Sequence, residues 1–285
     1  MALERNMAQI QAYQKQASEE QQKLKDKMGK IKHKIAIISG KGGVGKSTVA
    51  VNLATAFAMQ GKRVGVLDAD IHGPSVPRLL GLEGQQVKTG PTGVLPVDGP
   101  FGMKVMSIDF FLPEQAPTIW RGPLKMRAIR QFLSDIVWGE LDFLFIDLPP
   151  GTGDEPLSVA QLLPDMDGVV IVTMPSELSS SIVKKAITFA QRLNMPIIGV
   201  VENMSGFICP HCGRKTEIFK SGGGKKMAQE ASVPFLGSIP IDPKVGVDSD
   251  KGTPFVFSHK DSAATKAFME IVTNVEEYVN RTKQK

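Results

Sequence analysis

A strand, a glycine-rich turn and a helix follow one another between residues 34 and 59, and this order constrains the fold more than any other feature. Residues 34–39 contain a continuous apolar run that is typical of a buried strand. Residues 49–59 have a helical composition, and Gly61 ends the expected helix. The turn between them reads Gly-Lys-Gly-Gly-Val-Gly-Lys-Ser-Thr. We therefore expect an α/β fold with this turn at the carboxyl end of a strand.

This turn fits the pattern G-x-x-x-x-G-K-S/T, and each fixed position suits the binding of a triphosphate. Glycines let the backbone turn tightly and leave its N–H groups open to an anion. The helix that follows carries partial positive charge at its N-terminus. We expect Lys46 to contact the β- and γ-phosphates of a nucleotide and the Ser47 hydroxyl to bind Mg²⁺. The candidate nucleotide-binding residues of the turn are Gly40, Lys41, Gly42, Gly43, Val44, Gly45, Lys46, Ser47 and Thr48.

Composition argues against several classes of protein. With 285 residues, of which 42% are hydrophobic, the chain can form one large domain or two small ones with a sizeable core. No apolar run approaches the ~20 residues of a membrane span, and the charged N-terminus does not resemble a secretory signal. The two cysteines, Cys209 and Cys212, are too few and too close together for a disulfide-stapled secreted protein. We therefore expect a cytoplasmic protein without a membrane partner.

The positive charge is concentrated at the N-terminus. The net charge is +5, and residues 1–34 hold eight basic and four acidic side chains, so the rest of the chain comes to about +1. A body so close to neutral disfavours a nucleic-acid partner. Residues 1–33 are rich in Gln, Lys and Glu and are expected to form a basic arm that is partly helical or disordered. A helix that docks a partner is the alternative interpretation of this arm.

Short apolar runs alternate with helical stretches from residue 34 onward. This alternation predicts an α/β fold in which a mostly parallel, twisted sheet is flanked by helices on both faces. Residues 81–100 are rich in Gly, Pro, Thr and Val, which favours a small hairpin or a mobile loop. Residues 34–285 are expected to form one domain, with a cysteine-bearing loop near residues 207–216. The expected strands cover residues 34–39, 63–67, 103–108, 141–146, 168–173, 196–201 and 234–239, and the expected helices include residues 49–59, 124–136, 178–193 and 264–285.

Two acidic segments follow predicted strands, at the edge where open α/β sheets bind their ligands. Asp147 ends an apolar strand and suits a role in holding Mg²⁺, directly or through water. Asp70 lies on the loop after the second strand, where it can orient an attacking water. Either carboxylate alone is also compatible with a helix cap or a turn. Their order relative to the glycine-rich turn favours the functional interpretation.

With its second lysine, the turn is similar to the deviant Walker A motif of the MinD/ParA/ArsA-type P-loop NTPases. Within that group the chain resembles the Mrp (ApbC-type) iron–sulfur cluster carriers over roughly residues 34–275. The motifs that carry this resemblance are Asp68–Ser75 (DADIHGPS), Trp120–Pro123 (WRGP), Asp147–Asp154 (DLPPGTGD) and Cys209–Cys212 (CPHC).

The resemblance implies roles for residues that local chemistry does not assign. In such proteins the residue at Lys41 reaches across a dimer to the partner's nucleotide. Adenine contacts are implied for Asn203 and for Pro240 and Asp242. Eukaryotic relatives carry four further cysteines near the N-terminus, and many bacterial ones an additional N-terminal domain. This chain has neither, so we expect no second, stable cluster, and the family does not explain the arm.

A C-x-x-C pair offers two thiolates on one tight turn, which is half of a tetrahedral thiolate site. Because the chain has no other cysteine, a four-thiolate site must use Cys209 and Cys212 from two chains, as a two-fold axis allows. On chemistry alone, iron–sulfur and zinc sites are equally compatible, and a redox disulfide or inert thiols are further alternatives. His211 is either a third ligand or an exposed turn residue. The resemblance favours a bridging 4Fe–4S cluster.

These features, together with what the resemblance implies about the cluster, predict a slow ATPase that carries an iron–sulfur cluster in a homodimer and transfers it to apoproteins. Its expected cofactors are ATP, Mg²⁺ and the cluster. Lys41, Lys46 and Asp70 are the expected catalytic residues, and slow hydrolysis is expected because the chain shows no obvious arginine finger. Two alternatives are a MinD/ParA-like switch for spatial positioning and a zinc-bridged dimer.

Overall fold

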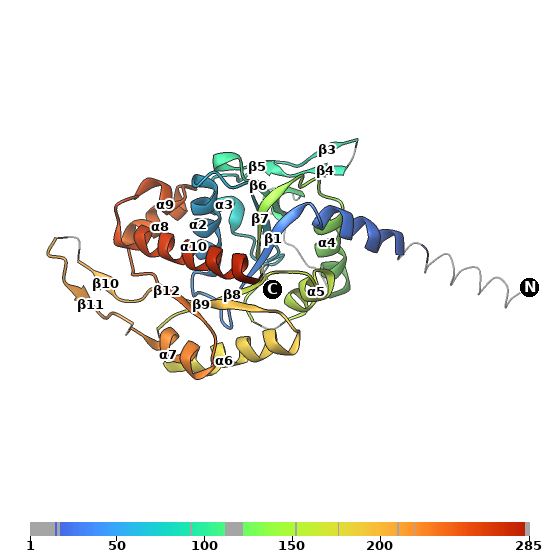
Figure 1. Cartoon of the computed structure of the whole chain (residues 1–285). Helices are drawn as coiled ribbons and strands as arrows, with labels where there is room; N and C mark the ends of the chain where they lie inside the picture. The colour runs from blue at the N-terminus through green and yellow to red at the C-terminus, as the bar shows by residue number, and fades with distance from the viewer. Residues whose placement is uncertain are drawn as a thin grey trace, which may run out of the picture.

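The computed structural model in Figure 1 describes residue 15 and residues 18–91, 93–111, 122–151, 153–175, 177–209, 211–219 and 221–282. Several positions singled out above lie outside these residues. They are Trp120 and Arg121 of the WRGP motif, Thr152, Pro210 and the first part of the expected arm.

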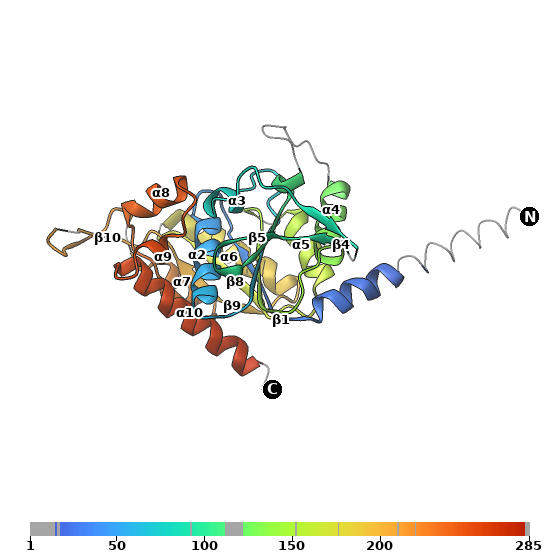
Figure 2. The ribbon, with the colours of Figure 1, turned by 90° about the horizontal axis from the view of Figure 1, so that it is seen from above.

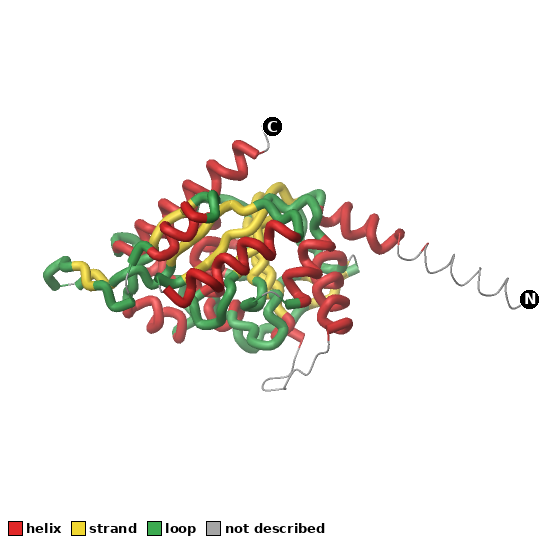
Figure 3. Tube along the Cα trace, turned by 90° about the horizontal axis from the view of Figure 1, so that it is seen from below, coloured by secondary structure: helices red, strands yellow, loops and turns green. Residues whose placement is uncertain are grey.

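An eight-stranded sheet forms the centre of the molecule (Figures 1 and 3). Its order is β12-β9-β8-β1-β7-β2-β6-β5, and all neighbours pair in parallel except β5 with β6. The central strands are buried on both faces, which explains their continuous apolar runs. The strands are β1 (Ile31–Ile38), β2 (Val64–Asp68), β5 (Val97–Asp98), β6 (Lys104–Ser107), β7 (Leu141–Asp147), β8 (Gly168–Thr173), β9 (Ile197–Glu202) and β12 (Phe235–Ser238).

Helices cover both faces of this sheet, as the direction of each crossover requires. The connection from β1 to β2 runs one way along the sheet, whereas the connections from β6 to β7, β7 to β8, β8 to β9 and β9 to β12 run the other way. Right-handed crossovers therefore put α2 on one face and α4, α5, α6 and α7 on the other. The expected mostly parallel α/β fold is confirmed. The helices are α2 (Lys46–Met59), α3 (Val76–Leu79), α4 (Gly122–Ser134), α5 (Asp154–Leu162), α6 (Glu177–Arg192), α7 (Gly223–Glu230), α8 (Pro243–Asp250), α9 (Phe255–Ser258) and α10 (Ala263–Thr282).

Helix α2, which follows the glycine-rich turn, is buried along almost its whole length because α9 and α10 cover the side that faces away from the sheet (Figure 2). Phe57 packs on Phe143 and Phe145 of β7, with ring centroids 4.4 and 5.3 Å apart. On the outer side, Asn52 Oδ1 accepts a hydrogen bond from the backbone N–H of Val256 at 3.0 Å. The helix that follows the glycine-rich turn is thus fixed from both sides.

Two small hairpins lie outside the main sheet. The segment 81–100 contains the antiparallel pair β3 (Lys88–Gly90) and β4 (Gly93–Leu95), so it forms the expected hairpin. The second pair is β10 (Phe207–Ile208) and β11 (Lys215–Thr216), which projects from the body in both views (Figures 1 and 2). We call residues 205–224 the cysteine segment, since they include this hairpin and both cysteines.

The boundary expected at residue 34 needs correction, because β1 begins at Ile31. Residues 18–28 are helical, and Leu24 and Met28 are only 5% and 2% exposed. These two apolar residues are four positions apart and so share one face of the helix. The part of the arm next to the body is therefore packed on the core. Among the described helices, none combines the length and apolarity needed to cross a bilayer.

Candidate functional site

The glycine-rich turn links the end of β1 to the start of α2. Gly43 and Gly45 both have left-handed backbones, with φ of 76° and 78°. Gly45 also stands at the N-cap of α2 without a side-chain cap, so the first N–H groups of the helix stay available to an anion. A Cβ atom on Gly45 would lie 2.3 Å from Asn203 Nδ2, so the position needs glycine for space as well as for conformation.

Lys46, Ser47 and Asp147 meet beneath this turn. Lys46 Nζ lies 2.6 Å from Asp147 Oδ1 and 3.2 Å from Ser47 Oγ. The lysine is 6% exposed and the carboxylate fully buried, and burial raises the pKa of Asp147 against the opposing effect of the Lys46 charge. Asp147 Oδ2 has no hydrogen-bond partner among the described residues. An orphaned buried carboxylate oxygen beside a serine hydroxyl fits the oxygen ligands that Mg²⁺ requires.

Asp68 is a second buried carboxylate in this site. Like Asp147, it lies at the carboxyl end of a parallel strand. It is the register partner of Asp147 on the neighbouring strand. Its oxygens accept hydrogen bonds from the backbone N–H groups of Asp70, Ser75 and Val76 at 3.0–3.1 Å. Burial, reinforced by the negative charge of Asp147, raises the pKa of Asp68 to about 8. Asp68 therefore positions the loop that carries Asp70.

Asp70 is half-buried on that loop, where Oδ1 accepts the backbone N–H of Gly73 at 3.2 Å. Asp70 therefore stabilises a turn, as the sequence allowed, through Oδ1 alone. Its Oδ2 remains available. Lys41 is exposed at the top of the glycine-rich turn, and its carbonyl accepts a hydrogen bond from Ser39 Oγ at 3.0 Å.

A pocket of about 290 Å³ begins at the glycine-rich turn and extends toward α8. The turn contributes Gly45 and Thr48, and the opposite wall contains Asn203, Pro240 and Asp242, which the resemblance linked to adenine. Asn203 Nδ2 donates to the Val44 carbonyl at 2.9 Å, so this wall is joined directly to the turn. Asp242 is also the N-cap of α8, where it accepts the Lys244 N–H at 3.0 Å. The expected phosphate and base subsites therefore lie in one continuous pocket, which we call the base pocket.

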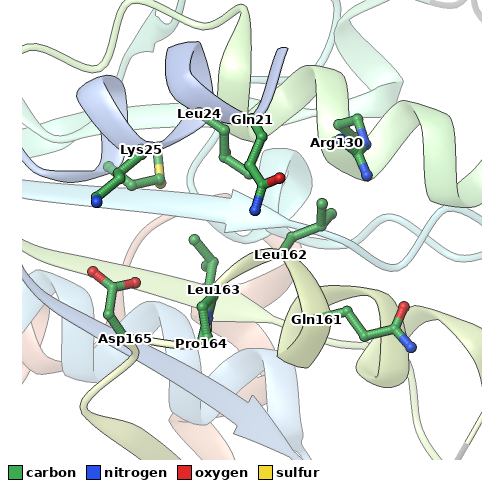
Figure 4. A pocket seen from close by; sticks show the side chains of 10 residues that line it. Gln21, Leu24, Lys25, Arg130, Gln161, Leu162, Leu163, Pro164 and Asp165 are labelled. Atoms are coloured by element: carbon green, nitrogen blue, oxygen red, sulfur yellow. The ribbon is translucent and has the colours of Figure 1, made fainter. Parts of the chain in front are cut away.

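A larger cavity, of about 430 Å³, lies between the N-terminal helix and the end of α5 (Figure 4). Leu24 and Gln21 face Leu162 and Leu163 across it, and Arg130 lies at one side. None of the predicted site residues contributes to its lining, so size alone does not identify the functional pocket.

The cysteine hairpin presents its two thiols on a tight turn. Cys209 is half-buried and Cys212 exposed, and neither forms a disulfide. The Cys209 N–H donates to the Arg214 carbonyl at 3.0 Å, and the Gly213 N–H to the Cys209 carbonyl at 2.9 Å. Backbone N–H groups of Cys212 and His211 lower the pKa of Cys209 by hydrogen bonding, which favours a thiolate. The described residues, which include both cysteines and all four histidines, hold no group of three candidate metal ligands.

The sequence analysis assigned no role to three residues that the structure places at the site. Asp68 had a signal, because it ends a strand as Asp147 does. Phe219 lines the base pocket from the cysteine segment, and Glu202 lies fully buried at the end of β9. Phe219 had no local signal, since an apolar residue in a loop does not indicate what it contacts.

The fold and this site define a nucleotide-binding protein of the P-loop class. A family model described as "ParA: NUBPL iron-transfer P-loop NTPase" matches residues 30–276. The chain belongs to this family. It is 56% identical over 263 residues to the iron-sulfur cluster carrier protein of Methanocaldococcus jannaschii, covering 92% of this chain and 90% of that protein.

Solved structures agree with this assignment. The nucleotide-binding protein of Archaeoglobus fulgidus, determined in complex with ADP, is 46% identical and has a TM-score of 0.74, covering 81% of this chain and 91% of that one. The cell division ATPase MinD of Pyrococcus furiosus has a TM-score of 0.61 at 22% identity, covering 86% and 99%. The latter likeness shows the MinD-like fold alone.

Proposed function

We propose that this protein binds and slowly hydrolyses ATP, and that a homodimer carries a bridging 4Fe–4S cluster for transfer to apoproteins in the cytoplasm. The observation that carries the proposal is the combination of a continuous phosphate and base site with a two-thiol hairpin in one family member. The M. jannaschii relative is named as an iron–sulfur cluster carrier, which supports the cargo.

The proposed nucleotide is ATP, as the resemblance to the deviant Walker A ATPases implies. The loop Gly40–Thr48 would hold the phosphates through its N–H groups and Lys46, and Asn203, Pro240 and Asp242 would contact adenine. Ser47 and Asp147 would hold Mg²⁺, consistent with the unpartnered Asp147 Oδ2. The metal would neutralise charge on the phosphates. Lys46, now paired with Asp147, would be shared with the γ-phosphate when ATP binds.

Hydrolysis requires a water molecule to attack the γ-phosphorus, so that ADP leaves. Asp70 would orient that water with its available oxygen. Lys46 and the exposed Lys41 of a second copy would stabilise the charge of the transition state. Two lysines without an arginine finger are consistent with slow turnover.

The cargo site would use four thiolates, Cys209 and Cys212 from each of two copies. The backbone hydrogen bonds to Cys209 stabilise the thiolate form, and the described residues supply no third ligand within the chain. A two-fold axis through the hairpins would complete a tetrahedral set. Arg214 and Lys215, both exposed on the hairpin, would offset the negative charge of the cluster.

The two alternatives from the sequence receive less support. Zinc uses the same four thiolates, so it is the iron–sulfur name of the M. jannaschii relative, and not the geometry, that favours the cluster. A positioning switch of the MinD type needs a membrane or DNA surface. In the C-terminal helix α10, however, the apolar residues Phe268, Ile271, Val272 and Val275 are buried against the body. That helix face is not available to a membrane.

Anaerobic reconstitution of the full chain with iron and sulfide tests the cargo. We expect about four iron and four sulfide per dimer, with the broad visible absorption of an iron–sulfur cluster. Cys209→Ser with Cys212→Ser should remain colourless yet bind ATP. Zinc retention without colour would contradict the cluster, and an unchanged iron content in the double variant would contradict the ligands. Calorimetry with ATP and Mg²⁺ tests the nucleotide independently.

A further inference from the structure

Both ends of the cysteine segment are held by one buried carboxylate. Glu202 Oε1 accepts hydrogen bonds from the Ser205 hydroxyl at 2.5 Å and the Gly222 N–H at 2.9 Å. Its other oxygen accepts the Gly224 N–H. A Cβ on Gly224 would lie 2.9 Å from the Glu202 Cβ, so the chain returns to the body in close contact with this side chain. The cysteine segment therefore leaves the body and returns to it at one place, which the hydrogen bonds of Glu202 hold fixed.

The same segment is joined to the wall of the base pocket. The Ser205 N–H donates to the Ile239 carbonyl at 2.8 Å, and the Ile241 N–H donates to the Gly206 carbonyl at 2.7 Å. Ile239 and Ile241 flank Pro240 in the pocket lining. The start of the cysteine hairpin is thus hydrogen-bonded to the residues expected to contact the base.

Phe219 extends this connection from the other side of the hairpin. It belongs to the cysteine segment and lines the pocket together with Gly45 and Thr48 of the glycine-rich turn. Its side chain is 47% exposed. A flat aromatic ring beside an open, largely apolar pocket next to a phosphate site is suited to contact a nucleobase. The neighbouring Ile218 is 54% exposed and does not line the pocket.

We propose that Phe219 contacts the base of the bound nucleotide, and that this contact restricts the cysteine segment and therefore the positions of Cys209 and Cys212. The inference rests on the proposed ATP site. The base would hold the segment at Phe219, while Glu202 holds its two ends. Two fixed points on one short segment leave the intervening thiols less freedom than one does. The nucleotide and the cargo would then be coupled within a single chain.

The first test compares ligands with and without a base. Phe219→Ala in the full chain should weaken ATP binding about tenfold, since a base–aromatic contact is lost. Binding of inorganic tripolyphosphate should be unchanged, because the phosphate loop is intact. Ile218→Ala, the matched control on the same segment, should bind both ligands as the unaltered chain does, and Phe219→Tyr should restore ATP affinity.

The second test measures the alkylation rate of the cluster-free thiols by iodoacetamide. Saturating ATP should slow alkylation at least twofold in the unaltered chain and in Ile218→Ala, but not in Phe219→Ala. Normal ATP affinity in Phe219→Ala, or undiminished protection of its thiols at saturating ATP, would overturn this inference alone. If the unaltered chain binds tripolyphosphate and ATP equally weakly, the proposed ATP site fails and the inference with it.

Discussion

Asp68 and Asp147 are register partners at the carboxyl ends of β2 and β7, so two fully buried carboxylates lie side by side beneath the glycine-rich turn. Among the described residues, a cation is in direct contact with Asp147 alone of the two, since Lys46 Nζ lies 2.6 Å from its Oδ1. Asp68 is instead stabilised by backbone N–H groups. Two like charges at this separation disfavour each other, and the pKa of Asp68 is raised to about 8 by burial and then by Asp147.

This raised pKa predicts a falling stability as pH increases from about 5.5 to 7.5. In that window the native protein keeps the Asp68 proton, whereas the unfolded chain, with a value near 3.8, has lost it. The native state therefore binds more protons, and the free energy of unfolding decreases with pH by up to ~1.4 kcal/mol per unit. Urea denaturation at several pH values measures this slope.

Asp68→Asn provides the comparison for that slope. The amide places an N–H₂ group against backbone donors, so the variant should be less stable than the unaltered chain at pH 5.5 by about 1–3 kcal/mol. Its stability should also depend less on pH, so the gap should narrow toward pH 7.5. Parallel slopes for the two proteins would rule out a protonated Asp68.

Alanine variants of Lys46 and Lys41 should both reduce ATP hydrolysis, but only the Lys46 variant should also reduce the free energy of unfolding. Lys46→Ala removes the partner of a buried carboxylate, which should lower the free energy of unfolding by about 3–5 kcal/mol and abolish ATP hydrolysis. Lys41→Ala alters an exposed side chain, so stability should change by no more than about 0.5 kcal/mol while hydrolysis falls. Denaturation and phosphate release are the measurements. Full hydrolysis by Lys41→Ala would exclude its catalytic role.

The parts of the fold that could be predicted are those with a local physical cause. Buried parallel strands need continuous apolar runs, so β1, β7 and β8 were located within a few residues. The glycine-rich turn could be predicted equally well, because the positive φ angles of Gly43 and Gly45 and the helix that follows depend on local sequence alone. The position of Asp147 beneath that turn could also be predicted, because the residue ends a neighbouring strand.

The remainder depends on contacts between distant segments. Glu202 and Gly222 are 20 positions apart, and Phe219 reaches the base pocket only because the cysteine segment folds back at Glu202. The N-terminal boundary was misplaced for a similar reason. Leu24 and Met28 are sparse apolar residues in a charged stretch, and only their packing partners in the body show that they are buried.

The packing of that N-terminal helix gives a third prediction. Met28 is 2% exposed, so Met28→Ala should reduce the free energy of unfolding by about 2–4 kcal/mol through lost burial and a residual cavity. Lys25 lies on the same helix but is exposed, so Lys25→Ala should change stability by no more than about 0.5 kcal/mol. Equal, small effects in thermal or urea denaturation would mean that the helix does not stabilise the body in solution.

Gly45 and Gly61 offer a matched pair for the last prediction, because both have left-handed backbones with φ of 78° and 81°. Alanine at either position should cost about 1 kcal/mol in backbone strain. At Gly61 a Cβ meets nothing within 4 Å, whereas at Gly45 it would lie 2.3 Å from Asn203 Nδ2. Asn203 is buried and bonded to the Val44 carbonyl, so it can move only by losing that hydrogen bond.

Gly45→Ala should therefore be less stable than Gly61→Ala by a further 1–3 kcal/mol and should bind ATP at least about tenfold more weakly. Gly61→Ala should keep the ATP affinity of the unaltered chain, since Gly61 lies at the far end of α2. Urea denaturation and calorimetry with ATP measure the two effects. Equal stability and affinity in the two variants would show that Asn203 can move at no cost. The hydrogen bond from Asn203 to the Val44 carbonyl would then not be needed to connect the turn with the base pocket.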